Sequence, residues 1–236
     1  MPRYFAVCVG LLLSSCAPPS PPTAIVLATS ERESLREYSG IAASLPGWRI
    51  LSIDLPAHGD DRRPGELKPL AAWRTRLDAG EDLIGDFAVR LSKMVDGLPN
   101  RPVAVIGVSR GGFLALHAAA RDPRITAVVA FMPVTHLGAL DEFGDANGRY
   151  DTLDVAHLAP RLVGRSVWMS IGRTDTRAST AAALTAAEAL EAPLLLEAES
   201  GHHYSQLAER AAATWLLDRS MPRSAMTSFA SLVRVR

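Results

Sequence analysis

A serine flanked by glycines is the clearest sign of chemistry in this chain. Residues 107–112 read Gly-Val-Ser-Arg-Gly-Gly, between an apolar run and a stretch of helical character. A serine on a tight strand-to-helix turn has a strained backbone, and the residues two positions away must be small to make room for it. Such a turn exposes the Ser109 hydroxyl and brings the backbone N–H of Arg110 to the same point. The pattern predicts a nucleophile at Ser109 and an oxyanion donor at Arg110, the alternative being a structural serine in a turn.

A serine hydroxyl needs a base, and the base needs an acid to orient it. Asp175 follows the apolar run 166–172, and His202 follows the run 193–197. The order Ser, Asp, His along the chain is a known arrangement of such a triad. Two alternatives stay open, because aspartate is also a common turn residue and His203 is adjacent to His202.

The elements that must position these residues alternate along the chain. Short apolar runs predict six strands, at 24–28, 49–54, 102–107, 125–131, 166–172 and 193–197. The stretches between them predict helices near 34–45, 70–97, 110–121, 177–191 and 204–218. Because the runs are continuously apolar rather than alternating, the strands are expected to be covered on both faces in a mainly parallel sheet. This pattern is typical of a single α/β domain, in which ligands bind at the carboxyl ends of the strands.

The segment 133–164 interrupts this alternation. A segment of this length in a compact domain is usually functional, so we expect a small cap or a loop over a pocket. A pocket role is open for His136 and His157. Several apolar residues are expected either to line an acyl pocket or to pack the segment down: Phe131, Met132, Leu137, Leu140, Phe143 and Tyr150.

Together these features resemble the α/β-hydrolase superfamily, over residues 24–219. The serine turn, the Gly-x-x-Asp turn at 172–175 and the Gly-His turn at 201–202 match it in type, order and strand position. Residues 54–59, Asp-Leu-Pro-Ala-His-Gly, also resemble the loop that follows the second strand in that superfamily. The resemblance implies a compact, small-capped serine hydrolase of the dienelactone-hydrolase or peptidase-like kind.

The resemblance also favours His202 over His203, because the superfamily's catalytic histidine directly follows the glycine. The turn after the first strand departs from the family pattern. The family has His-Gly there, and the next residue donates the second oxyanion N–H, whereas residues 28–32 of this chain read Ala-Thr-Ser-Glu-Arg. A backbone N–H from residues 29–32 is expected to serve, with Ser30 as the candidate.

This departure keeps two functions open, because loss of one oxyanion donor typically lowers turnover on the order of a hundredfold or more. The first is a serine hydrolase acting on a carboxylic ester, thioester or amide of small size, with peptidase or acyltransferase activity as variants. The second is a catalytically weak hydrolase fold that acts as a binding module at a cell envelope.

Four further polar residues have expected roles. The Arg110 guanidinium is expected at the floor of the pocket, where it holds a substrate carboxylate or pairs with an internal acid. His58 is expected to hold its own loop, and His117 to pack or lie at the surface. Arg74 and Arg76 are expected on a solvated helix face.

No cofactor or metal is expected. The pair His202 and His203 lacks further ligands at a recognisable spacing, and phosphate-loop and dinucleotide-binding patterns are absent from the sequence.

Composition excludes two other classes of protein. The 236 residues include 25 Lys and Arg against 25 Asp and Glu, so the broad basic surface of a nucleic-acid-binding protein is not expected. With 48% apolar and 21% charged residues, the chain is expected to fold around one core rather than to be largely disordered.

The N-terminal residues have a pattern that is typical of a targeting segment. Arg3 precedes an apolar run, Tyr4 to Leu13, that is too short to cross a bilayer as a helix. The following Leu-Ser-Ser-Cys at 13–16 resembles the lipobox of bacterial lipoproteins, which implies cleavage after residue 15 and a lipid on Cys16. An ordinary secretory signal is the alternative. Ala17 after the cysteine implies the periplasmic side of the outer membrane in a cell with two membranes.

The other end segments are a proline-rich stretch after the signal and a C-terminal tail. Residues 16–23 are rich in proline and predict a stiff tether between the lipid and the domain. Cys8 would leave with the signal and Cys16 would be acylated, so no disulfide is expected. Residues 220–236 are a C-terminal tail with no assigned role, and the oligomeric state is left open.

Overall fold

The computed structural model describes residues 21–27, 39–99 and 103–220. The lipoprotein signal at 1–15, Cys16, the turn at 29–32 with Ser30, and residues 221–236 lie outside the described residues. The expectations for these segments therefore stay predictions.

The centre of the fold is one sheet of six parallel strands in the order β2-β1-β3-β4-β5-β6. The prediction of an α/β domain with a parallel sheet is confirmed. The strands are β1 (Thr23–Leu27), β2 (Arg49–Ser52), β3 (Val103–Val108), β4 (Ile125–Phe131), β5 (Ser166–Gly172) and β6 (Leu194–Glu197).

Burial across the sheet explains the continuous apolar runs. Strands β1 and β3 are buried along their whole length, because helices cover both of their faces. The edge strands β2 and β6 are only partly buried. The core therefore lies on the two faces of the central strands, whose carboxyl ends all point to one edge of the sheet.

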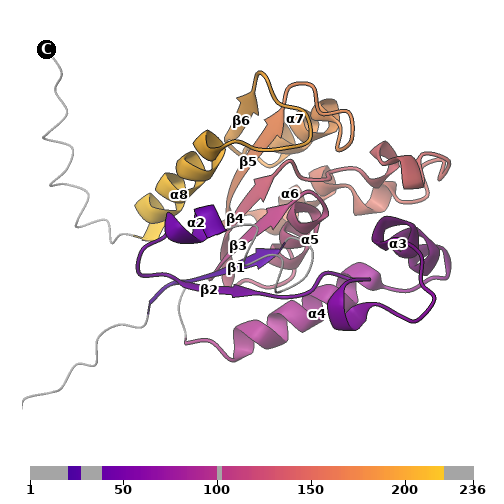
Figure 1. Cartoon of the computed structure of the whole chain (residues 1–236), viewed down its shortest axis with the longest axis horizontal. Helices are drawn as coiled ribbons and strands as arrows, with labels where there is room; N and C mark the ends of the chain where they lie inside the picture. The colour runs from indigo at the N-terminus through magenta and orange to yellow at the C-terminus, as the bar shows by residue number, and fades with distance from the viewer. Residues whose placement is uncertain (1–20, 28–38, 100–102, 221–236) are drawn as a thin grey trace, which may run out of the picture.

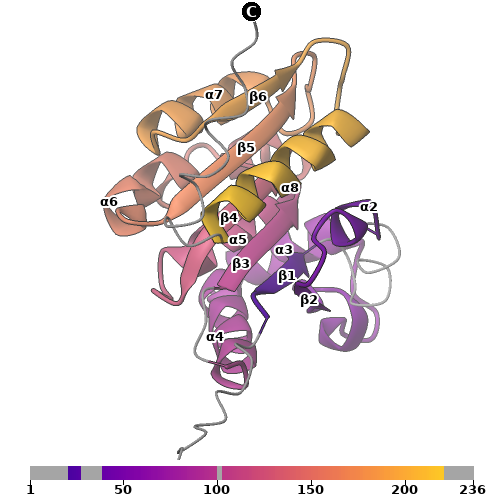
Figure 2. The same cartoon turned by 90° about the vertical axis from the view of Figure 1, so that its left-hand side faces the viewer.

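Helices cover both faces of this sheet. Helices α2 and α8 lie side by side on one face, and α4, α5 and α7 cover the other (Figures 1 and 2). The described helices are α2 (Ser39–Ala43), α3 (Pro69–Asp78), α4 (Leu83–Asp96), α5 (Arg110–Ala119), α6 (Ala159–Leu162), α7 (Thr180–Ala189) and α8 (Gln206–Ser220).

The prediction of one helix over 70–97 is wrong, because the structure has two helices there. Gly80 takes a φ of 81°, in the left-handed region that ends helices. Asp82 then begins α4 as its N-cap, and its side chain accepts a hydrogen bond from the Gly85 N–H at 3.0 Å. The left-handed Gly80 and the N-cap Asp82 therefore divide the predicted helix into α3 and α4.

The segment 133–164 folds into short 3-10 turns and helix α6 against the rest of the domain. Arg74 connects it to α3, since its guanidinium contacts Asp145 at 2.6 Å and lies over the Phe143 ring. The six apolar residues named above are all buried, including Leu137 and Phe143. They lie in the packed interior, and within the segment the Phe143 ring lies edge-on to the Tyr150 ring.

His117 joins α5 to this segment. It is 2% exposed, its Nε2–H donates to the Leu153 carbonyl at 2.9 Å, and its Nδ1 accepts from Arg121 at 3.3 Å. Burial lowers the pKa of His117 from 6.5 to about 4. The imidazole is therefore neutral in the folded protein at neutral pH. Of the two roles expected for His117, the structure shows packing.

This shift predicts that stability depends on pH. As the pH falls below about 6.5 the unfolded chain binds a proton at His117, whereas the folded protein does so only near pH 4. The contribution of neutral His117 to the free energy of unfolding is complete above about pH 6.5. It is lost as the pH falls toward 4, and its total is on the order of 3 kcal/mol. Urea unfolding at pH 7.5, 6 and 5 should show this slope in the wild type and a smaller slope in His117→Gln, which does not titrate. Equal slopes would contradict the assignment.

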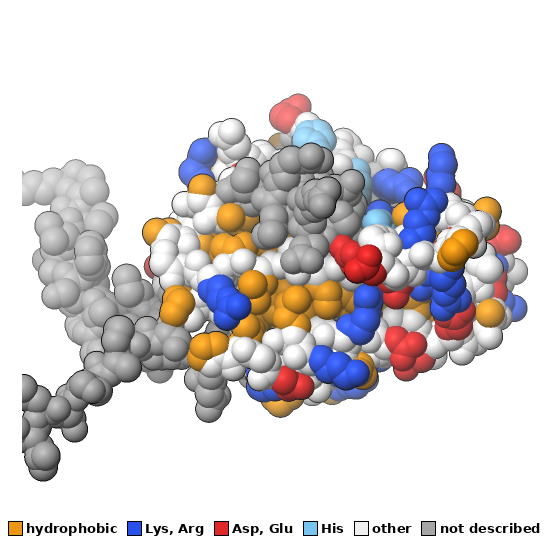
Figure 3. Space-filling view, turned by 60° about the horizontal axis from the view of Figure 1, so that its bottom comes forward, with side chains coloured by type: hydrophobic (Ala, Val, Ile, Leu, Met, Phe, Trp, Pro, Cys, Tyr) orange, Lys and Arg blue, Asp and Glu red, His pale blue; other side chains and the backbone are white. Residues whose placement is uncertain are grey.

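The described surface carries mixed charge. On the face shown in Figure 3, Lys and Arg side chains lie beside Asp and Glu side chains, around an area of apolar side chains. Within the described residues, no helix combines the length and the apolar character needed to cross a membrane.

Candidate active site

Ser109 lies on the turn between β3 and α5, with φ of 53° and ψ of −118°. Backbone hydrogen bonds fix it there: its N–H donates to the Phe131 carbonyl at 2.9 Å, and its carbonyl accepts from Val134 at 3.1 Å. These bonds compensate for a positive φ that is unfavourable for a residue with a side chain.

Two glycines allow this turn to pack. A Cβ on Gly107 would overlap the backbone of Gly111, and a Cβ on Gly111 would overlap the carbonyl oxygen of Leu27. The end of β1 therefore lies directly against the start of α5. The absence of side chains at these positions is a steric requirement of the structure.

The structure brings Ser109, His202 and Asp175 together from the ends of three strands. His202 Nε2 lies 3.0 Å from Ser109 Oγ, and His202 Nδ1 lies 2.8 Å from Asp175 Oδ2. With Nδ1–H donating to the carboxylate, Nε2 presents its lone pair to the serine hydroxyl. This is the geometry in which an imidazole accepts a proton from an attacking hydroxyl.

Backbone groups hold Asp175 in place. Its side chain is fully buried, and its Oδ1 accepts hydrogen bonds from the N–H groups of Arg177 and Ala178, both at 2.9 Å. These donors leave Oδ2 directed at His202. Sequence reasoning missed these donors, because backbone N–H groups leave no residue-type pattern.

His203 lies elsewhere. Its side chain is exposed, and its carbonyl accepts a hydrogen bond from Ser200 Oγ. The two adjacent histidines therefore have different environments, and only His202 is within hydrogen-bonding distance of Ser109 in the described structure.

Arg110 is the first residue of α5, so its backbone N–H lies at the amino end of the helix. The positive end of the helix dipole adds to the attraction for an anion at this point. The arrangement suits stabilisation of an oxyanion formed next to Ser109. The expected second donor, Ser30, lies outside the described residues.

The side chain of Arg110 extends to the loop after β2. Its Nη2 lies 3.1 Å from His58 Nε2, and His58 Nδ1–H donates to the Pro56 carbonyl at 2.9 Å. The His58 ring thus has a defined tautomer, with Nε2 as the acceptor for the guanidinium. His58 holds its own loop, as expected, and also contacts Arg110.

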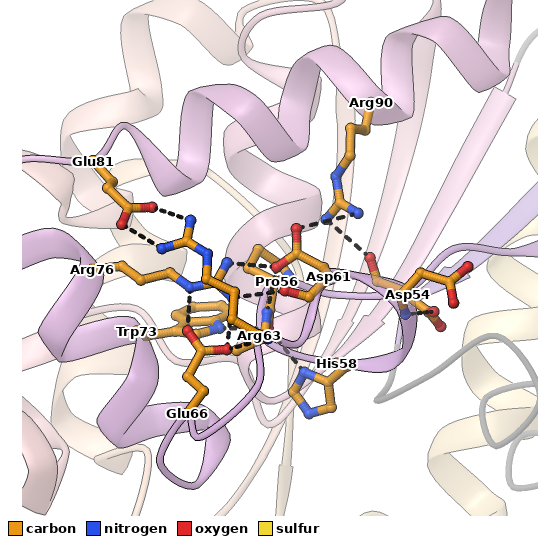
Figure 4. Close-up of polar contacts among 12 residues, drawn as sticks. Asp54, Pro56, His58, Asp61, Arg63, Glu66, Trp73, Arg76, Glu81 and Arg90 are labelled. Atoms are coloured by element: carbon orange, nitrogen blue, oxygen red, sulfur yellow. Dashed lines mark hydrogen bonds and ion pairs between the residues drawn. The ribbon is translucent and has the colours of Figure 1, made fainter.

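An ionic cluster around the buried Arg76 supports this loop. Arg76 contacts both carboxylate oxygens of Glu66, at 2.6 and 2.8 Å, and Asp61 Oδ2 at 2.6 Å. Asp61 in turn accepts from the Ala57 N–H at 2.7 Å. Figure 4 shows Asp61 between Arg76 and Arg90, with the His58 ring pointing away from this cluster.

The prediction that Arg76 lies on a solvated helix face is wrong, because Arg76 is only 5% exposed. Its guanidinium, through hydrogen bonds, lowers the pKa of Glu66 to about 2. For Arg74 the prediction is wrong in part, since its guanidinium binds the segment 133–164. Asp145, Glu66 and Asp61 lie outside α3, between 10 and 71 positions from their arginine partners, so the local charge pattern does not reveal them.

The remaining histidines lie outside this arrangement. His157 is exposed. His136 Nδ1 lies 2.8 Å from Asp154 Oδ1, and Asp151 is close enough for the three residues to form a group with metal-ligand character. The hydrogen bond to Asp154 already accounts for the orientation of His136.

A hollow of about 480 Å³ lies between α6, the start of β5 and the end of α7, and is lined by residues such as Leu162, Val167 and Leu190. The hollow lies at the amino end of β5, whereas Asp175 follows the carboxyl end of the same strand. The hollow is therefore at the opposite edge of the sheet from Ser109.

Comparison with known proteins agrees with the fold. A family model described as the alpha/beta hydrolase fold matches residues 24–218. A protein named Hydrolase LUC6, from a Fusarium species, is 37% identical over 111 residues, which cover 45% of this chain and 25% of that protein. The match thus spans only a quarter of the curated relative's length.

Solved structures show the same likeness. Acetyl xylan esterase 1 from Thermoanaerobacterium superposes with a TM-score of 0.66 at 18% identity, over 86% of this chain and 76% of that one. The protein TT1662 from Thermus thermophilus gives a TM-score of 0.65 at 19% identity, over 87% and 92%. At these identities the likeness concerns the fold alone.

The family match covers most of the chain, and the chain therefore belongs to the α/β-hydrolase family. The fold that defines this family is a single α/β domain built on one parallel sheet.

Proposed function

We propose that this protein is a serine hydrolase that cleaves carboxylic esters through an acyl-enzyme on Ser109. The observation that carries the proposal is the chain of hydrogen bonds from Ser109 Oγ to His202 at 3.0 Å and from His202 to Asp175 at 2.8 Å. The esterase named among the structural neighbours is consistent with an ester substrate.

In the first half of the reaction, Ser109 Oγ attacks the ester carbonyl carbon while its proton passes to His202 Nε2. Asp175 stabilises the resulting imidazolium and keeps the ring in position. The Arg110 N–H holds the oxyanion of the tetrahedral intermediate. The intermediate collapses, the bond to the leaving oxygen breaks, and His202 returns the proton to the alcohol.

In the second half, water attacks the acyl-enzyme and gives its proton to His202. The new tetrahedral intermediate collapses, the bond to Ser109 Oγ breaks, and the serine recovers its proton from His202. The products are the carboxylic acid and the free enzyme. Thioesters and amides would follow the same steps with sulfur or nitrogen as the leaving atom.

The test is the intact mass of the purified protein after treatment with a fluorophosphonate, which phosphonylates activated serines. We expect one adduct on the wild type and none on Ser109→Ala. A panel of short and long acyl esters then measures turnover. A folded wild-type protein with neither adduct nor turnover would favour the alternative of a binding module, which the altered turn at 28–32 suggests.

A further inference from the structure

Three side chains with metal-ligand chemistry meet in the segment 133–164. His136 Nδ1 lies 2.8 Å from Asp154 Oδ1, and one ligand atom from each of His136, Asp151 and Asp154 lies within 4.8 Å of the other two. The backbone brings them together, because the Val155 N–H donates to the Thr135 carbonyl at 2.9 Å. His136 and Asp154 are 18 positions apart in the chain, so no short spacing pattern in the sequence indicates this group.

The two carboxylates of this group have little compensation for their negative charge. Among the residues that the structure describes, no lysine or arginine forms an ion pair with Asp151 or Asp154, and the Asp151 carboxylate accepts no hydrogen bond. Carboxylates held this close repel each other. A divalent cation between them would replace that repulsion with attraction.

Two glycines leave room for the ligand side chains. A Cβ on Gly138 would lie 2.6 Å from His136 Nε2, and a Cβ on Gly148 would lie 3.0 Å from Asp151 Oδ2. A side chain at the first position would displace the imidazole, and one at the second would crowd the carboxylate. The group is also open to an ion from solvent, because Asp151 is exposed and the His136 side chain is 36% exposed.

We propose that His136, Asp151 and Asp154 bind one divalent transition-metal ion, for which Zn²⁺ is the probe. Imidazole and carboxylate together are typical Zn²⁺ ligands at roughly 2.0–2.2 Å, whereas Mg²⁺ and Ca²⁺ prefer oxygen ligands alone. His136 binds through the Nδ1 lone pair, which leaves its proton on Nε2, and water completes a four-coordinate shell. A rotation of the exposed Asp151 side chain brings its carboxylate to this distance.

The proposed ion connects two stretches of the segment, each of which is bonded to the elements around Ser109. The Val134 N–H, two residues before His136, donates to the Ser109 carbonyl at 3.1 Å. In the other stretch, the Leu153 carbonyl accepts from His117 on α5 at 2.9 Å. A metal shared by both stretches adds its binding free energy to the stability of the folded segment. The site is therefore structural, and it does not depend on the proposed serine-hydrolase function.

The test measures Zn²⁺ binding and thermal unfolding of the purified protein after metals have been removed with a chelator. Isothermal titration calorimetry with zinc chloride should show one ion bound per chain. At a free Zn²⁺ concentration of about a hundred times Kd, the melting temperature should rise by about 5–10 °C. Millimolar Mg²⁺ or Ca²⁺ should leave the Kd for Zn²⁺ unchanged, because neither ion favours an imidazole ligand.

Variants assign the binding to these residues. His136→Ala and Asp151→Asn each remove one ligand, and we expect each to raise the Kd for Zn²⁺ about tenfold or more. At the same Zn²⁺ concentration the rise in melting temperature should then fall by about half or more. His157→Ala and Asp141→Asn are the matched controls, since both residues are exposed in the same segment and lie outside the group.

The outcomes distinguish this site from other Zn²⁺ sites. Binding that is weakened in His136→Ala and Asp151→Asn but unchanged in both controls would support the proposal. Absence of Zn²⁺ binding, or binding that persists in Asp151→Asn, would overturn it, and the exposed position of Asp151 keeps this variant informative if His136→Ala does not fold. Tighter binding of Ca²⁺ than of Zn²⁺ would overturn the assignment to a transition metal. None of these measurements is an enzymatic activity, so failure of the hydrolase function would leave the result valid.

Discussion

His202→Ala is expected to lower kcat for ester hydrolysis by about 10⁴-fold or more. The variant removes the group that lies 3.0 Å from Ser109 Oγ and is oriented by Asp175 at 2.8 Å. Without it the serine hydroxyl has no base, and an unassisted hydroxyl is a poor nucleophile near neutral pH. Steady-state kinetics on a chromogenic ester measures the effect.

The chain supplies a matched control for this variant. His203→Ala removes an adjacent, exposed imidazole and should retain activity close to that of the wild type. Because residues of such a triad act as a unit, Ser109→Ala combined with His202→Ala should be about as inactive as either single variant. If His203→Ala were the inactive variant, or if the two single losses multiplied, the proposed mechanism would be wrong.

The second large effect is expected at Gly111 and concerns stability. A Cβ there would overlap the carbonyl oxygen of Leu27, and β1 cannot move away without losing its hydrogen bonds to β2 and β3. We expect Gly111→Ala to lower the free energy of unfolding by about 3 kcal/mol or more. For a domain of this size that corresponds to roughly 6–12 °C in melting temperature.

Gly144→Ala is the control for this substitution. Gly144 has a φ of −60°, and the nearest atom to its Cβ position is 3.8 Å away. Alanine is therefore tolerated there, and a change within about 1 kcal/mol is expected. Thermal unfolding followed by circular dichroism distinguishes the two variants, and similar melting temperatures would show that the turn at Ser109 tolerates a side chain.

The sequence predicted the sheet because its signals are local. Strands such as β3 and β4 are continuously apolar and end at turn residues, and both properties are visible in a short window. The helix pattern over 70–97 was misleading for the same reason. Gly80 and Asp82 ended one helix and began another, although the apolar period continued across them.

The sequence by itself also determined the turn type around Ser109 and the order of Ser109, Asp175 and His202. In a parallel sheet the carboxyl ends of the strands meet at one edge, so residues that follow different strands are brought close together. Strand position was thus sufficient to predict that these three side chains approach one another.

Only the tertiary structure decided how side chains pair across that edge. It showed that His202 rather than His203 faces Ser109, that Arg76 is buried against Asp61 and Glu66, and that Arg110 contacts His58. These partners lie between 10 and 93 positions apart in the chain. Side-chain pairing depends on distances that the packing of whole elements sets, and no local periodicity or turn preference specifies them.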